Sequence, residues 1–379
     1  MEILAVDIGT GTQDILVFNT DLDPENSYKL VVPSPTMIFH RQVRRATRLR
    51  KPVLLTGVLM GGGPLTWAVE AHIAAGLAVY ATPSAARTFD DDLEAVQREM
   101  GVTLVGEDEA QTLPGDVMHL ELADLDLDLI AAAFGHLGYS LAPDLIAVAV
   151  FDHGDAPVGY SDRQFRFDYL DQRIRESGRL SAFAYRADEI PNTMTRLQAV
   201  AGAARRLGMP MMVMDTAPAA ILGATLDVAV AERAQVLVAN IGNFHTLVFR
   251  LGPTGIEGVF EHHTGEVTRD RLDDLVAALA AGTLTHEDVF DDRGHGAAVL
   301  ASEPMRLRDD SWNLAVTGPR RSLIRDSRHR AYYAVPYGDM MMAGCFGMLR
   351  ALPDVYPDYA QPVLDCLARP GGRPPWEVV

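Results

Sequence analysis

Apolar and polar positions divide the chain into short apolar runs that alternate with amphipathic segments. Residues 1–6 and 13–18 are rich in apolar side chains and flank a glycine- and threonine-rich stretch, which predicts two strands joined by a tight turn. Residues 145–151 form a continuous apolar run, typical of a strand covered on both faces. Further strands are predicted at residues 52–57, 76–80 and 211–214, and helices at residues 65–75 and 193–207. This alternation predicts an α/β protein.

The C-terminal third of the chain repeats the opening pattern. A predicted buried strand at residues 235–239 is followed by the turn Asn240-Ile241-Gly242-Asn243 and by a returning strand at residues 244–249. A third strand is predicted at residues 258–262. Because a strand–turn–strand unit with a polar, glycine-containing turn occurs twice, the sequence indicates a duplicated α/β unit.

The first turn carries the residue types that bind a phosphate group. Gly9 and Gly11 lack the Cβ that would block a phosphate, and successive N–H groups of such a turn form an anion-binding nest. Thr10 and Thr12 add hydroxyl donors, and Asp7 at the strand end is placed to hold hydrated magnesium. A plain hairpin with a glycine turn explains the same residues, so the turn alone leaves both interpretations open.

Charge and cysteine content narrow the functional classes. The formal net charge is −18, so a nucleic-acid backbone would be repelled unless a local basic patch overcame the field. The basic run at residues 40–51 indicates the solvated face of a helix, with an anionic ligand or partner as the alternative. The two cysteines, Cys345 and Cys366, form no CxxC motif, which argues against a disulfide framework or an iron–sulfur cluster within one chain. No basic leader or long apolar span is present, so we expect a cytoplasmic location.

Five motifs, in order across most of the chain, resemble those of the actin, sugar kinase and heat-shock chaperone ATPase superfamily. They are a first phosphate motif at residues 7–12, a first connecting helix at 215–223, a second phosphate motif at 240–246, an adenosine motif at 314–321 and a second connecting helix at 338–347. Residues 317–321 (Thr-Gly-Pro-Arg-Arg) and the loop Asp152-His153-Gly154 further resemble a prokaryotic family often labelled "pyruvate formate-lyase activating enzyme related". A true activating enzyme of that kind needs a three-cysteine cluster motif, which two distant cysteines do not provide.

The resemblance implies a fold, a domain organisation and a cofactor. The fold is α/β, with duplicated ribonuclease H-like domains of the actin-like ATPase type and a nucleotide cleft between them. The first domain, with insertions, would span residues 1–228 and the second residues 232–335, and the C-terminal helices at residues 336–379 would cross back to the first domain. The implied ligands are ATP and Mg²⁺.

The resemblance also assigns roles to individual residues. Asp7 and Asp215 would place the metal, and Asp215, Asp152 and His153 would serve in catalysis. The residues implied in nucleotide binding are Asp7, Gly9, Thr10, Gly11, Thr12, Asn240, Gly242, Asn243, Gly318, Arg320 and Arg321. A second glycine-rich loop, which follows a predicted strand, and a nearby arginine would face the substrate; the residues are Gly62, Gly63, Thr66 and Arg163.

Structural alternatives accompany several of these assignments. Asp215 at a strand end can simply cap the next helix, and Asp152 can cap a glycine turn. Arg320 and Arg321 can stack on an adenine or pair with a phosphate, or they can form a surface pair. Adjacent strand residues point to opposite faces, so a structural role is expected for His262-His263 rather than a shared metal.

One departure from the superfamily pattern affects the expected activity. Asn240 stands where an aspartate is usual, and it brings no charge to magnesium, so binding is better supported than fast hydrolysis. The leading hypothesis is an ATP-binding, magnesium-dependent phosphotransferase or ATPase that acts on an unidentified small molecule. The alternatives are a non-catalytic nucleotide-dependent sensor or scaffold, and an ATP-driven activator of a partner enzyme. A protein partner and a homodimer are left open, whereas nucleic acid and membrane are not expected as partners.

Overall fold

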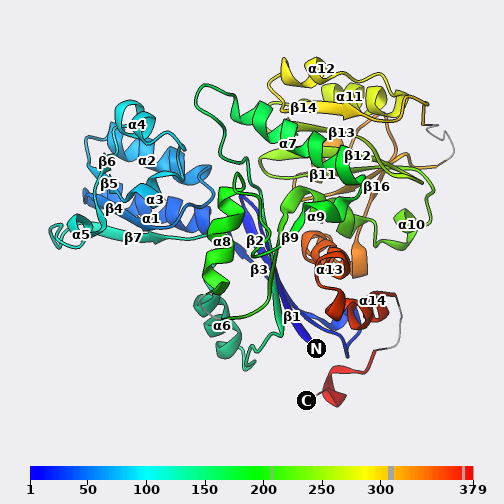
Figure 1. Ribbon diagram of the computed structural model, residues 1–379, viewed down its shortest axis with the longest axis horizontal. Helices are drawn as coiled ribbons and strands as arrows, with labels where there is room; N and C mark the ends of the chain where they lie inside the picture. Colours follow the sequence, from blue (N-terminus) through cyan, green and yellow to red (C-terminus); the bar gives the residue numbers. More distant parts are fainter. Residues whose placement is uncertain (206–207, 306–310, 369–371, 379) are drawn as a thin grey trace.

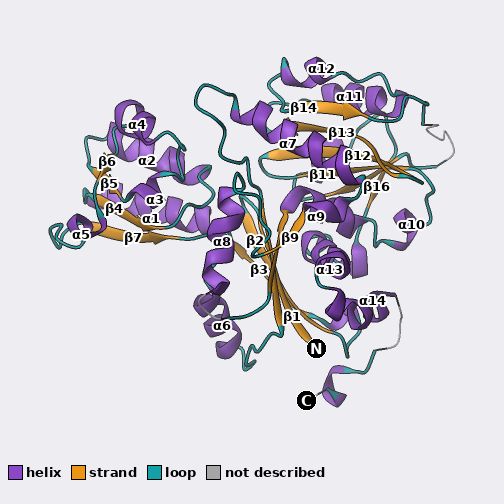
Figure 2. Cartoon of the chain, in the orientation of Figure 1, coloured by secondary structure: helices purple, strands orange, loops and turns teal. Residues whose placement is uncertain are grey.

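The computed structural model describes residues 1–205, 208–305, 311–368 and 372–378, and within these ranges the chain forms three β-sheets (Figure 1). Two large sheets form the body of the molecule, and a smaller sheet with its own helices lies to one side (Figure 2). The helix predicted at residues 193–207 is present as α8 (Thr195–Arg205), and its last two predicted residues lie outside the described ranges.

The first large sheet has the strand order β3-β2-β1-β8-β10-β9. Its strands are β1 (Glu2–Ile8), β2 (Thr12–Asn19), β3 (Tyr28–Pro33), β8 (Leu145–Val150), β9 (Ala184–Arg186) and β10 (Met211–Asp215). Strands β3, β2 and β1 are antiparallel, whereas β8 pairs in parallel with β1 and β10. The hairpin and the buried strands predicted from the apolar runs are therefore confirmed.

The second large sheet has the order β14-β13-β12-β11-β15-β16. Its strands are β11 (Val236–Ile241), β12 (His245–Gly252), β13 (Gly255–His263), β14 (Gly296–Val299), β15 (Leu314–Thr317) and β16 (Ala331–Tyr333). Strands β13, β12 and β11 are antiparallel, and β15 and β16 continue in parallel, so this sheet repeats the order of the first. The repeated order, three antiparallel strands followed by two parallel ones, is that of duplicated ribonuclease H-like domains. The predicted fold is confirmed.

The third sheet, with the order β6-β5-β4-β7, belongs to a segment inserted between β3 and β8. Its parallel strands are β4 (Val53–Gly57), β5 (Val79–Ala81), β6 (Thr103–Leu104) and β7 (Met118–Leu122). Its helices are α1 (Pro35–Leu49), α2 (Pro64–Ala74), α3 (Pro83–Ala86), α4 (Leu93–Ala95) and α5 (Glu107–Ala110). The basic run falls mainly on α1, where the buried Val43 and Ala46 face the core of the insert, so the predicted helix is confirmed.

Helices cover both faces of each large sheet. They are α6 (Leu127–His136), α7 (Asp162–Ser177), α9 (Thr216–Ala224), α10 (Val228–Ala231), α11 (Arg269–Ala281), α12 (His286–Phe290), α13 (Ala343–Val355) and α14 (Ala360–Ala368). Alternate residues of β1 pack into different cores: Leu4 packs with α6 and α8, and Ile3 packs with α13. In the same way, Val238 of β11 packs with α7 and α9, whereas Leu237 packs with α11. The period-2 alternation of a strand thus builds a three-layer arrangement around each sheet.

Helices α9 and α13 cross in close contact between the two large sheets (Figure 1). A Cβ on Gly223 of α9 would overlap the carbonyl oxygen of Ala343, and a Cβ on Gly347 of α13 would overlap that of Ala219. The two backbones approach this closely only because both crossing positions are glycine. Part of the predicted C-terminal segment, residues 369–371 and 379, lies outside the described ranges.

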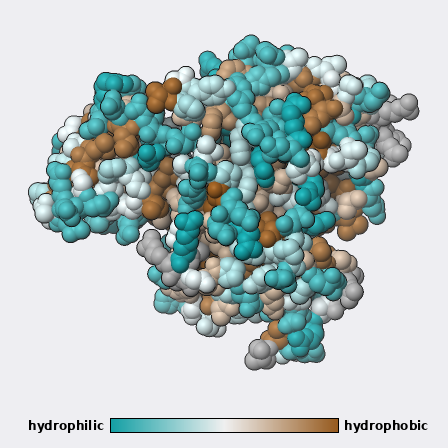
Figure 3. Space-filling view, viewed as in Figure 1, coloured by the Kyte–Doolittle hydropathy of each residue, from teal (hydrophilic) through white to brown (hydrophobic). Residues whose placement is uncertain are grey.

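The face in Figure 3 is largely hydrophilic, and its apolar areas are small and separate, in keeping with a net charge of −18. Within the described ranges, every helix is too short or too polar to cross a bilayer.

Candidate functional site

A cavity of about 490 Å³ opens where the two large sheets and the inserted segment meet. Most of the residues singled out in the sequence line it: Asp7, Gly9, Thr10, Thr12, Gly62, Gly63, Thr66, Asp152, His153, Arg163, Asn240, Gly242, Asn243 and Gly318. The lining, within the described ranges, does not include Gly11, Asp215, Arg320 or Arg321. The fold therefore brings together segments that are more than 300 residues apart in the chain.

The two glycine-containing turns have the same backbone geometry and face each other. In the first, the N–H of Gly9 donates to the carbonyl of Thr12 at 2.9 Å, and in the second the N–H of Gly242 donates to the carbonyl of His245 at 2.9 Å. A Cβ on Gly11 would overlap Nδ2 of Asn243, so the tips of the turns are in contact. A side chain at position 11 would therefore displace the Asn243 amide.

Two carboxylates lie side by side at the base of the first turn. Asp7 on β1 and Asp14 on β2 are directly opposite each other in the antiparallel register, and both line the cavity. Burial, with repulsion from Asp215, raises the pKa of Asp7 to about 7, although Thr216 Oγ1 donates to its Oδ1 at 2.6 Å. Burial, with repulsion from Asp7, raises the pKa of Asp14 to about 8, and its buried Oδ1 has no hydrogen-bond partner among the described residues. The pair is therefore electrostatically costly unless a proton or a cation joins it.

The N-terminal end of α13 closes the side of the cavity next to Asp7. A Cβ on Gly344 would overlap Oδ2 of Asp7, so only glycine lets the helix approach that carboxylate. Gly344, Met340 and Met341 line the cavity beside Asp7. The second connecting segment thus contributes directly to the site.

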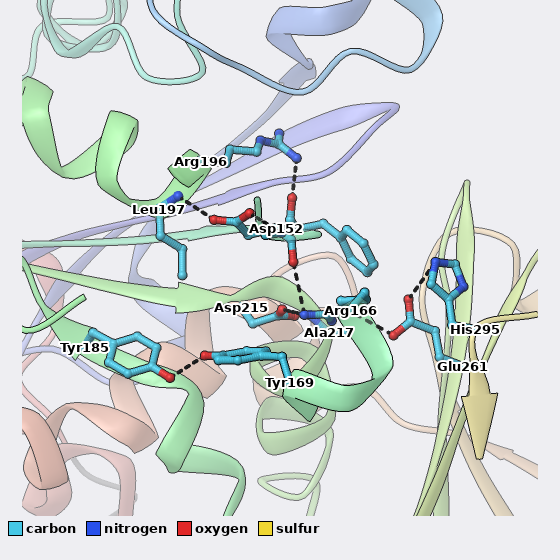
Figure 4. Close-up of polar contacts among 12 residues, drawn as sticks. Asp152, Arg166, Tyr169, Tyr185, Arg196, Leu197, Asp215, Ala217, Glu261 and His295 are labelled. Carbon is cyan, nitrogen blue, oxygen red and sulfur yellow. Dashed lines mark hydrogen bonds and ion pairs between the residues drawn. The ribbon is translucent and has the colours of Figure 1, made fainter. Parts of the chain in front are cut away.

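Asp215 is held in a buried ion-pair network rather than exposed to the cavity (Figure 4). Its carboxylate accepts hydrogen bonds from Arg166 of α7 and, at 3.0 Å, from the N–H of Ala217 at the start of α9. Arg166 is fully buried, and its Nε lies 3.4 Å from Oε2 of Glu261 on β13. Asp215 therefore caps α9, as the structural alternative held, and also neutralises an arginine; its catalytic role stays a prediction.

Asp152 and His153 follow β8 at the cavity wall and have different surroundings. The carboxylate of Asp152 accepts from the N–H groups of Gly154 and Leu197, both at 2.9 Å, which corresponds to the capped glycine turn. Burial raises the pKa of Asp152 despite these donors. Burial and the nearby charge of Arg166 lower the pKa of His153 to about 3, so this imidazole is neutral. Of the two, His153 has the side chain left available for a ligand.

The second glycine-rich loop forms the opposite wall and belongs to the inserted segment. Thr36 Oγ1 donates to the carbonyl of Gly62 at 2.6 Å, and a Cβ on Gly62 would overlap the carbonyl oxygen of Thr88. Gly63 has φ +42° and precedes α2, where Thr66 sits in the first turn. Across the cavity, Arg163 donates from Nη1 to the carbonyls of Phe290 and Gly294. The loop thus faces the cavity as expected, but the structure gives it no ligand-specific role.

The predicted adenosine motif is divided by the structure. Gly318, with φ +98°, sits against Asn240 Oδ1 and the carbonyl of Ile241, and it lines the cavity together with Pro319. The N–H of Arg320 donates to the carbonyl of Ile241 at 2.9 Å, and the Arg321 guanidinium lies 5.4 Å from the Tyr333 ring centroid. The backbone of this motif therefore reaches the cavity, whereas the Arg321 side chain lies over Tyr333, and neither arginine belongs to the lining.

Sequence reasoning missed Asp14, Thr216 and Gly344. Asp14 carried a usable signal, because a hairpin centred on the turn places it directly opposite Asp7. Thr216 and Gly344 lie within the two predicted connecting helices, but nothing in the sequence indicated their contact with Asp7, since each meets it from a segment more than 200 residues away.

The profile of one protein family, described as "Putative pyruvate format-lyase activating enzyme (DUF1786)", matches residues 60–323. The chain belongs to this family. The resemblance stated from the motifs is thereby confirmed. No curated protein matches the chain.

Among solved structures, the chain is similar to the ethanolamine utilization protein EutJ from Carboxydothermus hydrogenoformans, with 10% identity, coverage of 93% and 89% of the two chains and a TM-score of 0.32. It is also similar to a ROK hexokinase from Thermus thermophilus, with 12% identity, coverage of 93% and 98% and a TM-score of 0.29. A third is an activator of 2-hydroxyisocaproyl-CoA dehydratase from Clostridium difficile with bound ADPNP, with 10% identity, coverage of 93% and 97% and a TM-score of 0.24. Similarity at this level says nothing about the activity of this chain.

Proposed function

We propose that the chain binds ATP with Mg²⁺ in the cavity between its two halves and uses it for phosphoryl transfer or hydrolysis. One observation carries the proposal: two turns with the same hydrogen-bond pattern meet at a cavity that also holds a pair of buried carboxylates. Turn N–H groups and hydroxyls bind anionic oxygen, and paired carboxylates bind a hard cation. A magnesium-bound polyphosphate offers both the anionic oxygens and the hard cation that these groups bind.

The donors fit the phosphates and the carboxylates fit the metal. The N–H groups of the two turns, other than those of Gly9 and Gly242, which donate within their own turns, and the hydroxyls of Thr10 and Thr12 would hold the phosphates. Asp7 and Asp14 would hold Mg²⁺ or its waters, since Asp14 Oδ1 is buried without a partner and the pKa values of both are raised. This assignment gives Asp14 the metal role that the sequence gave to Asp215.

The remaining walls of the cavity divide between the nucleoside and an acceptor. The Gly318-Pro319 backbone is the candidate for contact with the nucleoside. The acceptor side consists of the loop at Gly62 and Gly63, with His153 and Arg163 across from it. Trp67 of α2 stacks on Phe244 of the second turn, with ring centroids 5.5 Å apart, so the insert contacts the second half of the molecule at the cavity edge. This contact is placed to respond to nucleotide-driven closure.

A second candidate function is nucleotide sensing without turnover. The observation that favours it concerns the residues predicted for catalysis: Asn240 is neutral, Asp215 pairs with Arg166, and Asp152 accepts two backbone hydrogen bonds. A water-activating base would then have to be another carboxylate of the lining, such as Asp162, or come from the acceptor or a partner protein.

Nucleotide-dependent thermal shift and phosphate release, measured on the purified full chain, separate these functions. ATP with Mg²⁺ is expected to raise the melting temperature of the wild type, and Asp7→Asn is expected to remove the magnesium-dependent part of the rise. Asp108→Asn, on the exposed surface of α5, is the matched control and should behave as wild type. Phosphate release lost in Asp7→Asn supports catalysis, and a shift without release supports sensing. Absence of any shift with any nucleoside triphosphate would refute both.

A further inference from the structure

Three histidines from separate segments converge beside the nucleotide cavity. His153 follows β8 in the first half of the molecule, His245 begins β12, and His295 precedes β14 in the second half. One side-chain nitrogen from each lies within 4.8 Å of the other two. The ligands of a tetrahedral zinc ion at 2.0–2.1 Å are about 3.4 Å apart, so ring movements of about 1 Å would close the triangle.

Three of the six ring nitrogens in this cluster are buried without a hydrogen-bond partner in the described part of the chain. They are His245 Nε2 and both ring nitrogens of His295. His295 is fully buried, and a buried imidazole without partners is costly. Their neighbours are aromatic: His245 stacks on Phe151 at 4.0 Å between centroids, which fixes the plane of its ring.

The protonation state suits a ligand role. Burial lowers the pKa of all three imidazoles, and the positive charge of Arg166 acts in the same direction. Neutral imidazole is the form that coordinates a metal ion.

A buried carboxylate, Glu261, lies beside His295 (Figure 4). Oε1 of Glu261 lies 3.8 Å from Nε2 of His295, which is too long for a hydrogen bond. A small movement of the ring would form that bond and leave Nδ1 for an ion. A carboxylate that orients a ligating histidine is a recurrent second contact in metal sites. Arg166 acts on all three imidazoles, and its pairing with both Asp215 and Glu261 leaves this group with a formal charge of −1 when both carboxyls are ionised. Arg163 and Arg196 add positive charge near His295 and His153 respectively.

We propose that His153, His245 and His295 form a binding site for a divalent transition-metal ion of the zinc type, which joins the two halves of the molecule. Three imidazoles leave at least one coordination position unfilled. His153 and His245 line the cavity, so that open position faces it and can take an anionic oxygen ligand. The site shares no residue with the carboxylate pair proposed for Mg²⁺. The two sites also differ in metal preference, because transition metals prefer imidazole nitrogen and magnesium prefers carboxylate oxygen.

The test uses chelator-treated full-length protein without nucleotide, so its outcome is independent of the proposed ATP binding. Titration with Co²⁺, followed by the visible d–d absorption of the four-coordinate ion, should saturate at one ion per chain, and Zn²⁺ should displace it. Inorganic phosphate added to the Co²⁺-loaded protein should change the spectrum if a position is open to the cavity. An unchanged spectrum would overturn the open position.

Single substitutions identify the ligands. His153→Ala, His245→Ala and His295→Ala should each weaken Co²⁺ affinity at least tenfold, while His136→Ala, at the exposed end of α6, should not. His263→Ala tests the trio, because the His263 ring centroid lies only 4.6 Å from that of His295. If His263→Ala abolishes binding and His153→Ala has no effect, the assignment is wrong.

Folding is checked in the metal-free state. His295 is buried, so His295→Ala could fail to fold. His153→Ala and His245→Ala, at cavity-lining positions, then still test the ligand set, and His295→Gln tests the third position with a side chain of similar volume. Metal-free melting temperatures near the wild-type value, together with lost binding, support the proposal. Wild-type protein that binds no Co²⁺ or Zn²⁺, or binds it unchanged in all three variants, overturns it.

Discussion

Asp14 offers a direct test of the carboxylate pair, because its replacement by asparagine should stabilise the metal-free protein. The pKa of Asp14 is raised from 3.8 to about 8, chiefly by burial and then by the charge of Asp7. Since the pKa is higher in the folded state, folding takes up a proton at intermediate pH. The resulting cost is absent below about pH 4, grows as the pH rises and is complete above about pH 8. The free energy of unfolding should therefore fall across this window.

The size of the effect follows from the same shift. Each pKa unit corresponds to about 1.4 kcal/mol, so ionised Asp14 costs at most about 6 kcal/mol above pH 8. An asparagine side chain there still has buried polar atoms without full hydrogen bonding, which costs about 1–3 kcal/mol. We expect Asp14→Asn to raise the free energy of unfolding by about 3 kcal/mol at pH 9 and by much less at pH 5.

Urea denaturation at pH 5, 7 and 9, with and without Mg²⁺, measures this difference. In the absence of metal, the gain of Asp14→Asn over wild type should increase with pH. Mg²⁺ should stabilise the wild type at pH 9 and have little effect on the variant, because the ion replaces the missing proton. Asp108→Asn controls for a change of net charge. A gain that is the same at every pH, or a variant destabilised at pH 9, would refute the assignment of Asp14 as a buried, cation-seeking carboxylate.

Three further predictions concern the packing and the closure of the site. Gly223→Ala forces a Cβ into the carbonyl of Ala343 and should destabilise the protein by about 1–3 kcal/mol or more in urea denaturation. Gly202→Ala, in α8 with open space around it, should instead stabilise the protein by about 0.5–1 kcal/mol. Equal effects of the two substitutions would contradict the close helix crossing. Arg166→Met leaves Asp215 and Glu261 buried and unpaired, so it should lower the free energy of unfolding by about 3–5 kcal/mol. Arg175→Ala, in an exposed ion pair, should lower it by less than about 1 kcal/mol. A small loss of stability in Arg166→Met would show that the buried network is dispensable. ATP with Mg²⁺ should change the tryptophan fluorescence through Trp67, which stacks on Phe244 at the cavity edge. Trp67→Phe should remove that change, while the fluorescence of Trp312 and Trp376 remains. A nucleotide-dependent change that persists in Trp67→Phe would locate the motion elsewhere.

Local patterns in the sequence were sufficient for the elements and for the duplication. The apolar runs around residues 7–12 and 240–243 predicted both hairpins, because a buried strand and a glycine turn are specified by residues that are close in the chain. The connecting helices were identified from the resemblance of their motifs to those of the superfamily, and the phosphate role of the turns stays a prediction. The domain boundaries and the individual site roles stay predictions, since they depend on which segments meet.

The tertiary structure alone decided how those segments meet. Asp215 looked like a catalytic acid, but Arg166 arrives from α7 and pairs with it, and no feature of residues 211–217 indicates that contact. The three-histidine cluster was equally hidden, because His153, His245 and His295 are about 90 and 50 residues apart in turn, and His153 follows a strand of a different sheet from the other two. Short-range sequence determines strands, turns and caps, since their energetics are local. The partners of a buried charge or an imidazole are set by the packing of distant elements, which only the folded chain defines.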